Sequence, residues 1–261
     1  MTIADQTRVA APTFAPPYRA AADTVDLLRS RGFAVLDARA TSALVGVPLA
    51  DLDALQSSWN DLPPDGYLKD GGRYRKRRHA CFVADGTHLE QTAHRAHWQP
   101  VEYNALHGGM QRWFEPVAPR VVATDAWTGL LRGLAAVCSQ VRAVDRWSIE
   151  AHQFRIDTAD GIGRPTPEGA HRDGVDFVAV LLVARRGVKG GETRVFEADG
   201  PDGQRFTMTE PWTMLLLDDA RVIHESTPIQ PLDRSDASQG IRDTLVVTLR
   251  ANAFQGDPES S

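Results

Sequence analysis

The second half of the chain alternates short runs of β-forming residues with turn-forming residues, and this pattern restricts the fold more than any other feature. Gly, Pro and Asp separate runs that each have the length of one strand. Strands of this length with turn signals between them are typical of an antiparallel sandwich or barrel and not of βαβ units. The predicted strands cover residues 148–156, 176–183, 193–196, 213–217 and 244–249.

The first half of the chain carries mainly helical signals. Asp23 is a suitable N-cap for an apolar segment at helical spacing, and Gly32 stands just past its end. Apolar spacing predicts further helices over 48–59 and 126–144, and extended segments over 33–36 and 73–83. We therefore expect an α+β fold in which a helical N-terminal half supports a C-terminal β-barrel.

A chain of 261 residues is long enough to bury one sizeable core. We expect a single domain over 18–255 with its β-core at 147–252, a loose lead-in over 1–17 and a flexible tail over 256–261. Neither Cys81 nor Cys138 lies in a CxxC pair, which argues against a disulfide framework. The first fifteen residues lack the features of a signal peptide, and no apolar run is long enough to span a bilayer. These features predict a cytoplasmic protein.

The charge distribution argues against nucleic-acid and membrane partners. A formal net charge of −5 gives no general attraction to nucleic acid or to an anionic membrane. The one basic cluster, at 73–79, is more typical of a solvated face or of a rim that attracts anions. If the segment is extended, Arg78 shares a face with Tyr74 and lies opposite Arg75. A nucleic-acid module remains an alternative that salt-dependent binding would reveal.

Three residues have the types and spacing of a metal site. His171 and Asp173 are two apart, so in an extended segment they direct an imidazole nitrogen and a carboxylate oxygen to one side. His224, at the edge of an apolar run, supplies a third ligand. Two imidazoles and one carboxylate on one face of an octahedral metal leave positions open, as binding of substrate and dioxygen at iron(II) requires. His-x-Asp alone is common, so the wider sequence must decide.

Several further motifs surround these three residues in a recognisable order. They are His152-Gln-Phe-Arg155, 167–177, Lys189-Gly-Gly-Glu192, 217–224, Thr227-Pro228 and Arg242-Asp-Thr-Leu-Val-Val-Thr. With them, residues 147–252 resemble the double-stranded β-helix core, a jelly-roll or cupin-like barrel, of iron(II)/2-oxoglutarate-dependent dioxygenases. The resemblance is closer to the bacterial branch that hydroxylates free L-amino acids, the L-isoleucine dioxygenase-like enzymes.

The resemblance implies Fe(II), 2-oxoglutarate and O2, with succinate and CO2 as coproducts. It also implies a cation, on the strand after the distal His, that binds the far carboxylate of 2-oxoglutarate. Arg242 begins such a strand, and its guanidinium fork matches a carboxylate. Arg250 and Arg234 remain alternatives, and Arg242 as a surface charge at a strand end is another.

The substrate implied by the resemblance is a free L-amino acid, hydroxylated on its side chain. A site for it needs a cation and an acidic residue. Arg155 points away from its apolar neighbours on an extended run, either into the site or outward to solvent. The remaining candidates are Arg75 and Arg78 for the carboxylate, and Glu168 and Asp176 for the ammonium group.

Two supporting roles and two rivals complete the expectations. Gly190-Gly191 is predicted to form a hairpin turn, and Asp218-Asp219 to shape the turn before His224 and to orient a ligand imidazole. One rival is a cupin-type metal-binding protein without oxidative chemistry. The other keeps the chemistry but takes an N-modified, carrier-bound or peptide-linked amino acid. The sequence does not determine the oligomeric state or the carbon that is attacked. It also does not determine whether the reaction is a hydroxylation, a sulfoxidation or a desaturation.

Overall fold

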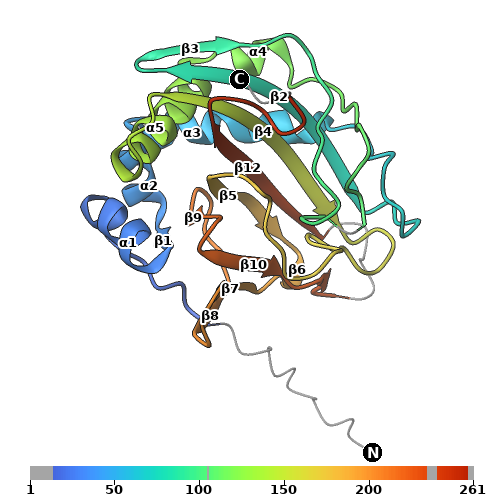
Figure 1. Ribbon diagram of the computed structural model, residues 1–261. Coiled ribbons are helices and arrows are strands. Elements are labelled where there is room, and N and C mark those ends of the chain that lie inside the picture. The colour runs from blue at the N-terminus through green and yellow to red at the C-terminus, as the bar shows by residue number, and fades with distance from the viewer. Residues whose placement is uncertain (1–13, 105, 234–239, 258–261) are drawn as a thin grey trace, which may run out of the picture.

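The computed structural model of the protein describes residues 14–104, 106–233 and 240–257. A seven-stranded antiparallel sheet in the order β1-β9-β5-β12-β4-β2-β3 forms its centre (Figure 1). Its strands are β1 (Phe33–Leu36), β2 (Arg75–Asp85), β3 (His88–Gln91), β4 (Arg146–Asp157), β5 (Phe177–Arg186), β9 (Met214–Asp218) and β12 (Ile241–Ala251).

Two small sheets complete the barrel beside the large one. The first has the order β10-β7-β8 and the second pairs β11 with β6. Val178 and Leu215 of the large sheet pack in one apolar cluster with Val195 and Val222 of the β10-β7-β8 sheet. The strands are β6 (Val188–Gly190), β7 (Thr193–Glu197), β8 (Gly203–Phe206), β10 (Val222–Ser226) and β11 (Ile229–Pro231).

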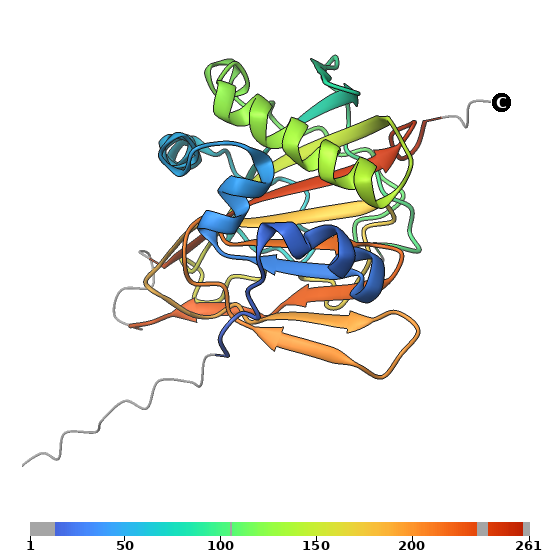
Figure 2. The same ribbon diagram turned by 90° about the vertical axis from the view of Figure 1, so that its left-hand side faces the viewer.

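Helices cover the outer face of the large sheet (Figure 2). The longest is α5 (Asp125–Val141), which begins where the Thr124 hydroxyl accepts a hydrogen bond from the Trp127 N–H at 3.2 Å. Leu130, Leu131 and Leu134 of α5 are buried in the main core. The others are η1 (Ala21–Asp23), α1 (Thr24–Arg31), α2 (Ala38–Val45), α3 (Leu49–Leu55), η2 (Gln56–Asp61) and α4 (Pro119–Val122).

Strand β12 shows how the large sheet separates core from cavity. Leu245, Val247 and Leu249 belong to the core that the helices cover. The alternate residues line a cavity on the inner face: Arg242, Thr244, Val246 and Thr248. Because successive strand residues point to opposite faces, this one strand supplies both the apolar core and polar groups for a site.

The predicted α+β fold with a double-stranded β-helix core is confirmed. The five predicted strands of the second half appear as β4, β5, β7, β9 and β12, and the helix predicted over 126–144 is α5. Helix α2 was not predicted, although Asp37 caps it by accepting a hydrogen bond from Ala40 N–H at 2.8 Å. The short strands β3, β6, β8 and β11 were not predicted either, because their three or four residues, unlike those of β1, form no continuous apolar run.

The predicted hairpin at Gly190-Gly191 is wrong in its pairing. Both glycines have positive φ, as a turn requires, but they join β6 to β7, which pair with different strands. A Cβ on Gly190 would lie 2.3 Å from the carbonyl oxygen of Pro228, so close backbone approach requires glycine there. The lead-in over 1–13 and the tail over 258–261 lie outside the described residues.

Among the described residues, no helix combines the length and apolar character needed to cross a membrane.

We predict that Leu131→Ala lowers the free energy of unfolding by about 2–5 kcal/mol, because the side chain is fully buried and its removal leaves a cavity. Chemical denaturation measures this change. Arg132→Ala, on the exposed side of the same helix, is the matched control and should change stability by less than about 0.5 kcal/mol. Equal effects of the two substitutions would contradict the assignment of the core.

Candidate active site and metal centre

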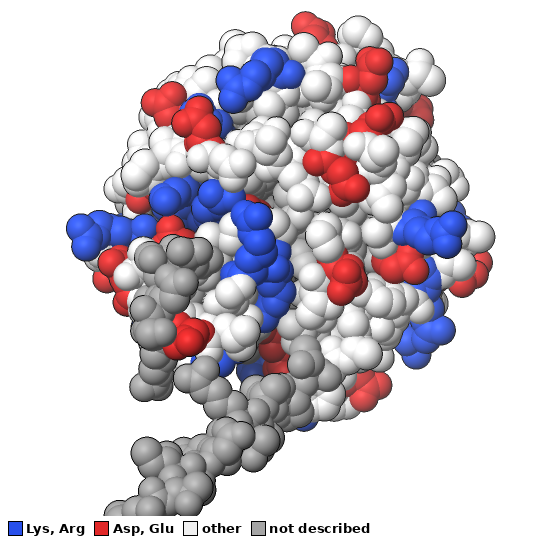
Figure 3. Space-filling model, turned by 180° about the vertical axis from the view of Figure 1, so that it is seen from behind, with Lys and Arg blue, Asp and Glu red and all other residues white. Residues whose placement is uncertain are grey.

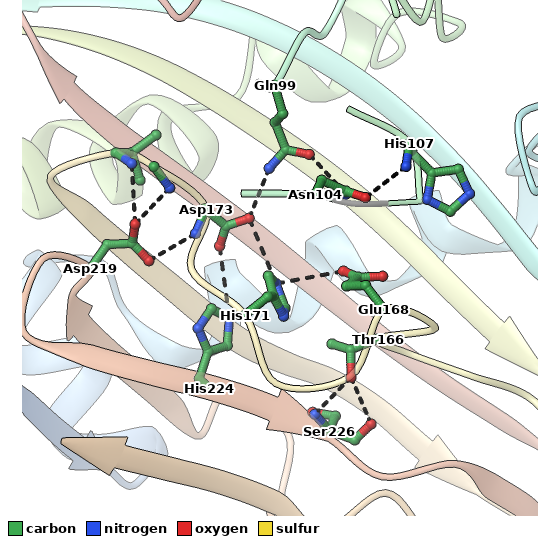
Figure 4. Close-up of polar contacts among 12 residues, drawn as sticks. Gln99, Asn104, His107, Thr166, Glu168, His171, Asp173, Asp219, His224 and Ser226 are labelled. Atoms are coloured by element: carbon green, nitrogen blue, oxygen red, sulfur yellow. Dashed lines mark hydrogen bonds and ion pairs between the residues drawn. The ribbon is translucent and has the colours of Figure 1, made fainter. Parts of the chain in front are cut away.

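Backbone pairing brings the three predicted metal ligands together. The backbone N–H of His171 donates to the carbonyl oxygen of His224 at 3.0 Å, and the backbone N–H of His224 donates to the carbonyl oxygen of His171, also at 3.0 Å. Nε2 of His171 then lies 3.9 Å from Oδ1 of Asp173, and Nε2 of His224 lies 3.8 Å from Oδ2 (Figure 4). These separations exceed hydrogen-bond lengths, so the three side chains converge without bonding to one another.

The imidazoles are held in a form that suits a metal. Nδ1 of His171 lies 3.0 Å from the carbonyl oxygen of Gly169, so it carries the proton and leaves the Nε2 lone pair toward Asp173. Burial lowers the pKa of His224 to about 4, with the neighbouring His171 as a further cause, so His224 is neutral at pH 7. Although burial opposes it, the charges of Asp173 and Glu168 raise the pKa of His171, and a metal bound at Nε2 would replace the proton there. Two imidazole nitrogens and one carboxylate fit iron(II).

Asp219 holds the segment that carries two of the ligands. Its carboxylate accepts the backbone N–H groups of Asp173, Gly174 and Val175 at 3.0, 2.7 and 3.2 Å. Burial, with the charge of Asp173 as a further cause, raises the pKa of Asp219 to about 6. The predicted contact of Asp218-Asp219 with a ligand imidazole is wrong: Asp219 orients the backbone, and Asp218 pairs with Arg142 at 2.8 Å.

The metal ligands open into a cavity lined by inward-facing side chains of β2, β4 and β12. Arg242 lines this cavity and is 3% exposed, and its Nη2 has no hydrogen-bond partner among the described residues. Burial lowers the pKa of Arg242 to about 10, and the nearby Arg185 adds to the effect. Arg242 therefore remains a cation at pH 7 and can bind an anion in the cavity.

Three further arginines lie on the same cavity. Nε of Arg75 donates to Asp65 at 2.7 Å, and Arg77 lies 3.9 Å from the same carboxylate. Arg112 has no ion pair within the described residues; its Nη2 donates to the Gln99 side-chain oxygen at 2.8 Å, and its buried Nε has no partner there. Arg112 is thus a second buried cation without a counter-ion.

One acidic group on the cavity also lacks a partner. Oε2 of Glu168 is buried and accepts no hydrogen bond from the described residues, while Oε1 lies 3.6 Å from Nε2 of His171. Glu168 is among the charges that act on Arg112, so the two opposite charges lie within electrostatic reach of each other. The cavity therefore presents a metal site, together with two cations and one carboxylate that each have a buried atom without a hydrogen-bond partner among the described residues.

Comparison with known proteins identifies the family. The family model described as 2OG-Fe dioxygenase matches residues 56–248. The chain belongs to this family. The dioxygenase accordingly uses Fe(II), 2-oxoglutarate and O2, and the cupin-type protein without oxidative chemistry is excluded. A search of curated proteins found no match.

Solved structures share the fold of this chain. The crystal structure of a bsmA homolog from Methylobium petroleophilum PM1 is 53% identical, with a TM-score of 0.88, over 94% of this chain and 98% of that one. IDO from Bacillus thuringiensis shares the fold at 16% identity and a TM-score of 0.71, over 93% and 100% of the two chains. The Fe(II)/(alpha)ketoglutarate-dependent dioxygenase TqaL shares the fold at 21% identity and a TM-score of 0.68, over 90% of this chain and 88% of that one.

The structure brings only some of the predicted substrate residues to the cavity of the dioxygenase. Arg75 and Glu168 line it, but Arg78, Arg155 and Asp176 do not. Arg78 donates to the carbonyl oxygens of residues 61 and 116, and Asp176 pairs with Arg142 and accepts the N–H of residue 251.

Arg155 points away from its apolar neighbours, as predicted, but those neighbours face the cavity. Phe154 and Ile156 line it, so Arg155 lies on the other side of the sheet. There the guanidinium donates two hydrogen bonds to Asp243, at 2.8 and 2.7 Å. Of the alternatives to Arg242, Arg250 bonds to carbonyl oxygens of the C-terminal segment away from the cavity, and Arg234 lies outside the described residues.

The basic cluster at 73–79 does not form a continuous surface patch. Arg75, Arg77 and His79 are buried, whereas Lys76 pairs with Asp157 at 3.4 Å. Strand alternation therefore sends half of the cluster inward. Basic and acidic side chains both occur across the face of the molecule shown in Figure 3.

Sequence reasoning missed a second cluster of possible metal ligands next to the cavity. Glu150 Oε2 lies 2.6 Å from His97 Nδ1, 2.9 Å from His79 Nε2 and 3.5 Å from His152 Nε2. Ligand atoms that share a metal at about 2.1 Å stand about 3 Å or more apart, so the shortest separation is a hydrogen bond and not a metal-ligand spacing. The cluster is a closed network around one carboxylate.

The network fixes the charge state of its members. Burial would raise the pKa of Glu150, but the three imidazoles hold it well below its usual range. Burial lowers the pKa of His97 to about 4 and that of His152 well below its usual value. Glu150 is therefore an anion, and His97 and His152 are neutral at pH 7.

We predict that Asp173→Ala abolishes turnover and sharply reduces bound iron while the fold stays intact, because three protein ligands are the minimum for this site. Iron content after anaerobic loading and the thermal midpoint measure the two effects. Asp202→Ala, at an exposed carboxylate, should leave both unchanged. Normal iron binding by Asp173→Ala would show that the metal is held elsewhere.

Proposed function

We propose that the enzyme hydroxylates the side chain of a free L-amino acid, and that Arg242 binds the far carboxylate of 2-oxoglutarate. The observation that carries the substrate assignment is the pair Arg112 and Glu168. Each lines the cavity and has a buried atom that lacks a hydrogen-bond partner among the described residues, and the two charges are opposite.

The role of Arg242 follows from its place on β12. It shares the cavity face with Thr244 and Val246, and both histidine ligands line the same cavity. A buried guanidinium with an unpaired nitrogen is costly unless an anion joins it, and a carboxylate matches its fork. The 2-oxoglutarate molecule carries one carboxylate beyond the 2-oxo acid group that binds the metal, and Arg242 is suited to receive it.

The substrate class follows from the charges that remain. A free amino acid carries a carboxylate and an ammonium group on one carbon, so it can satisfy Arg112 and Glu168 together. Apolar side chains on the same cavity, Phe154, Ile156 and Val180, suit the side chain that is oxidised. A peptide-linked or N-acylated amino acid would leave at least one of the two buried charges without a partner.

The chain contributes binding and orientation. Bound iron(II), with 2-oxoglutarate and O2, supplies the oxidising chemistry. His171, Asp173 and His224 hold the metal, Arg242 fixes the cosubstrate, and Arg112 with Glu168 fixes the substrate backbone atoms relative to it. This chemistry requires no side-chain general base, and we assign none.

We predict that Arg242→Ala raises the KM for 2-oxoglutarate by roughly 30- to several-thousand-fold, since losing a charge-assisted pair in a buried site costs about 2–5 kcal/mol. Steady-state succinate formation measures it. Arg250→Ala is the control, because Arg250 bonds to backbone carbonyls away from the cavity. If the KM rose with Arg250→Ala and not with Arg242→Ala, the cosubstrate assignment would pass to Arg250.

The substrate is tested with the standard L-amino acids, each assayed for succinate formation and product mass with Fe(II), ascorbate and 2-oxoglutarate. We expect the best amino acid to be turned over far faster than its methyl ester or its N-acetyl derivative, because each derivative leaves a buried charge unpaired. Faster turnover of the N-acetyl or peptide form would refute the free-amino-acid assignment. The iron and 2-oxoglutarate chemistry would stand.

A further inference from the structure

Gln99 connects Arg112 to a metal ligand through its side-chain amide. Oε1 of Gln99 accepts hydrogen bonds from Arg112 Nη2 at 2.8 Å and from Asn104 Nδ2 at 3.2 Å. Its Nε2 donates to Oδ1 of Asp173 at 3.2 Å (Figure 4). Two N–H donors on Oε1 fix which end of the amide faces Asp173. Gln99 is 5% exposed, so water does not compete freely for these bonds.

The backbone holds Gln99 and Arg112 in register. His97 and Arg112 form an antiparallel bridge, with N–H···O distances of 2.9 and 3.0 Å in the two directions. This bridge lies beside the Glu150 network, since Nδ1 of His97 donates to Glu150. The segment has no regular strand, so these contacts set the position of the Arg112 guanidinium relative to the metal site.

Besides Arg242, Arg112 is the cavity arginine that forms no ion pair within the described residues. Asp65 pairs with Arg75 and lies near Arg77, whose guanidinium also stacks 3.6 Å from the centre of the Phe114 ring. Arg75, Arg77 and Arg112 each keep one buried guanidinium nitrogen without a hydrogen-bond partner there, so the missing ion pair is what distinguishes Arg112. An incoming carboxylate gains most at this group.

We propose that Arg112 is the carboxylate subsite of the substrate and that Gln99 is a positioning residue, which couples occupancy of that subsite to the iron ligand Asp173. This inference rests on the proposed function for the identity of the anion. A carboxylate on Arg112 restrains the guanidinium, the guanidinium restrains the Gln99 amide, and the amide holds Oδ1 of Asp173. Oδ2 of Asp173 accepts from no such side-chain donor within the described ranges and lies 3.8 Å from Nε2 of His224.

Coupling of this kind is reciprocal. If an amino acid on Arg112 improves the orientation of Asp173, it raises the affinity for iron, and iron raises the affinity for the amino acid by the same factor. Metal ligands depend on their hydrogen-bond partners for orientation, and loss of such a partner typically lowers metal affinity by about 10- to 100-fold. The enzyme would then assemble its metal site fully only when substrate is present.

The test is an anaerobic Fe(II) titration of the full chain, with and without each standard L-amino acid. For the wild type we expect the amino acid that is turned over to raise Fe(II) affinity by about 5- to 150-fold. Gln99→Met should lower Fe(II) affinity by about 10- to 100-fold and reduce the effect of the amino acid to about 1-fold. An unchanged amino-acid effect in Gln99→Met would overturn the proposal.

Gln255→Met is the matched control. Its Nε2 donates to the backbone carbonyls of Asp173 and Gly174, at 3.0 and 2.7 Å, but reaches neither Arg112 nor the Asp173 carboxylate. It should therefore keep the amino-acid effect on Fe(II) affinity. Loss of that effect in both variants would mean that general loosening of the segment, and not the Gln99 link, is responsible.

A double-mutant cycle makes the result independent of the substrate. Arg112→Met and Gln99→Met should each lower Fe(II) affinity in the absence of amino acid, and the double variant should lose no more than Gln99→Met alone. Additive losses would overturn the link even if no amino acid were turned over. Failure of every amino acid in the wild-type assay would instead refute the proposed function, while a non-additive cycle would leave the Arg112–Gln99–Asp173 link standing.

Discussion

Two backbone hydrogen bonds between His171 and His224 determine where the metal centre forms. The segment around His171 belongs to no strand, so its position depends on this bridge to β10 and on the three N–H groups that Asp219 accepts. Strand β10 in turn is placed by its pairing with β7. His224 is far from His171 and Asp173 in the sequence, but each ligand is held by backbone contacts, which are stiffer than side-chain contacts.

The large sheet then decides what surrounds the metal. One face of β12 packs against the helices, and the other face carries Arg242 and its neighbours into the cavity. Buried guanidinium groups without counter-ions are unfavourable for folding, and the extensive apolar core offsets that cost. These buried charges are thus local weaknesses of the fold, and anions bound to them would stabilise it.

Much of the fold and the metal ligands could be predicted because their signals are local. His171 and Asp173 are two residues apart in one short segment, and the residues of β12 alternate between core and cavity with a period of two. Arg112 and Gln99 carry no such signal: they lie between β3 and α4 in a segment without regular structure, and only the His97–Arg112 bridge and neighbouring side chains place them. The sequence correctly predicted that Arg155 points to the opposite side of the strand from Phe154 and Ile156. It does not say, however, that Phe154 and Ile156 face a cavity and not the core.

The Glu150 network has a consequence for how the protein acquires its metal. Four buried groups of metal-binding type lie close together beside the cavity, and they would compete with the intended ligands for iron. Hydrogen bonding weakens this competition, because His97 Nδ1 and His79 Nε2 point at the carboxylate, and a nitrogen that carries a proton cannot donate electrons to a metal. All of these contacts fall on one oxygen, Oε2 of Glu150. Pairing within one ligand set therefore makes it a poorer competitor for iron, although both sets consist of imidazoles and a carboxylate.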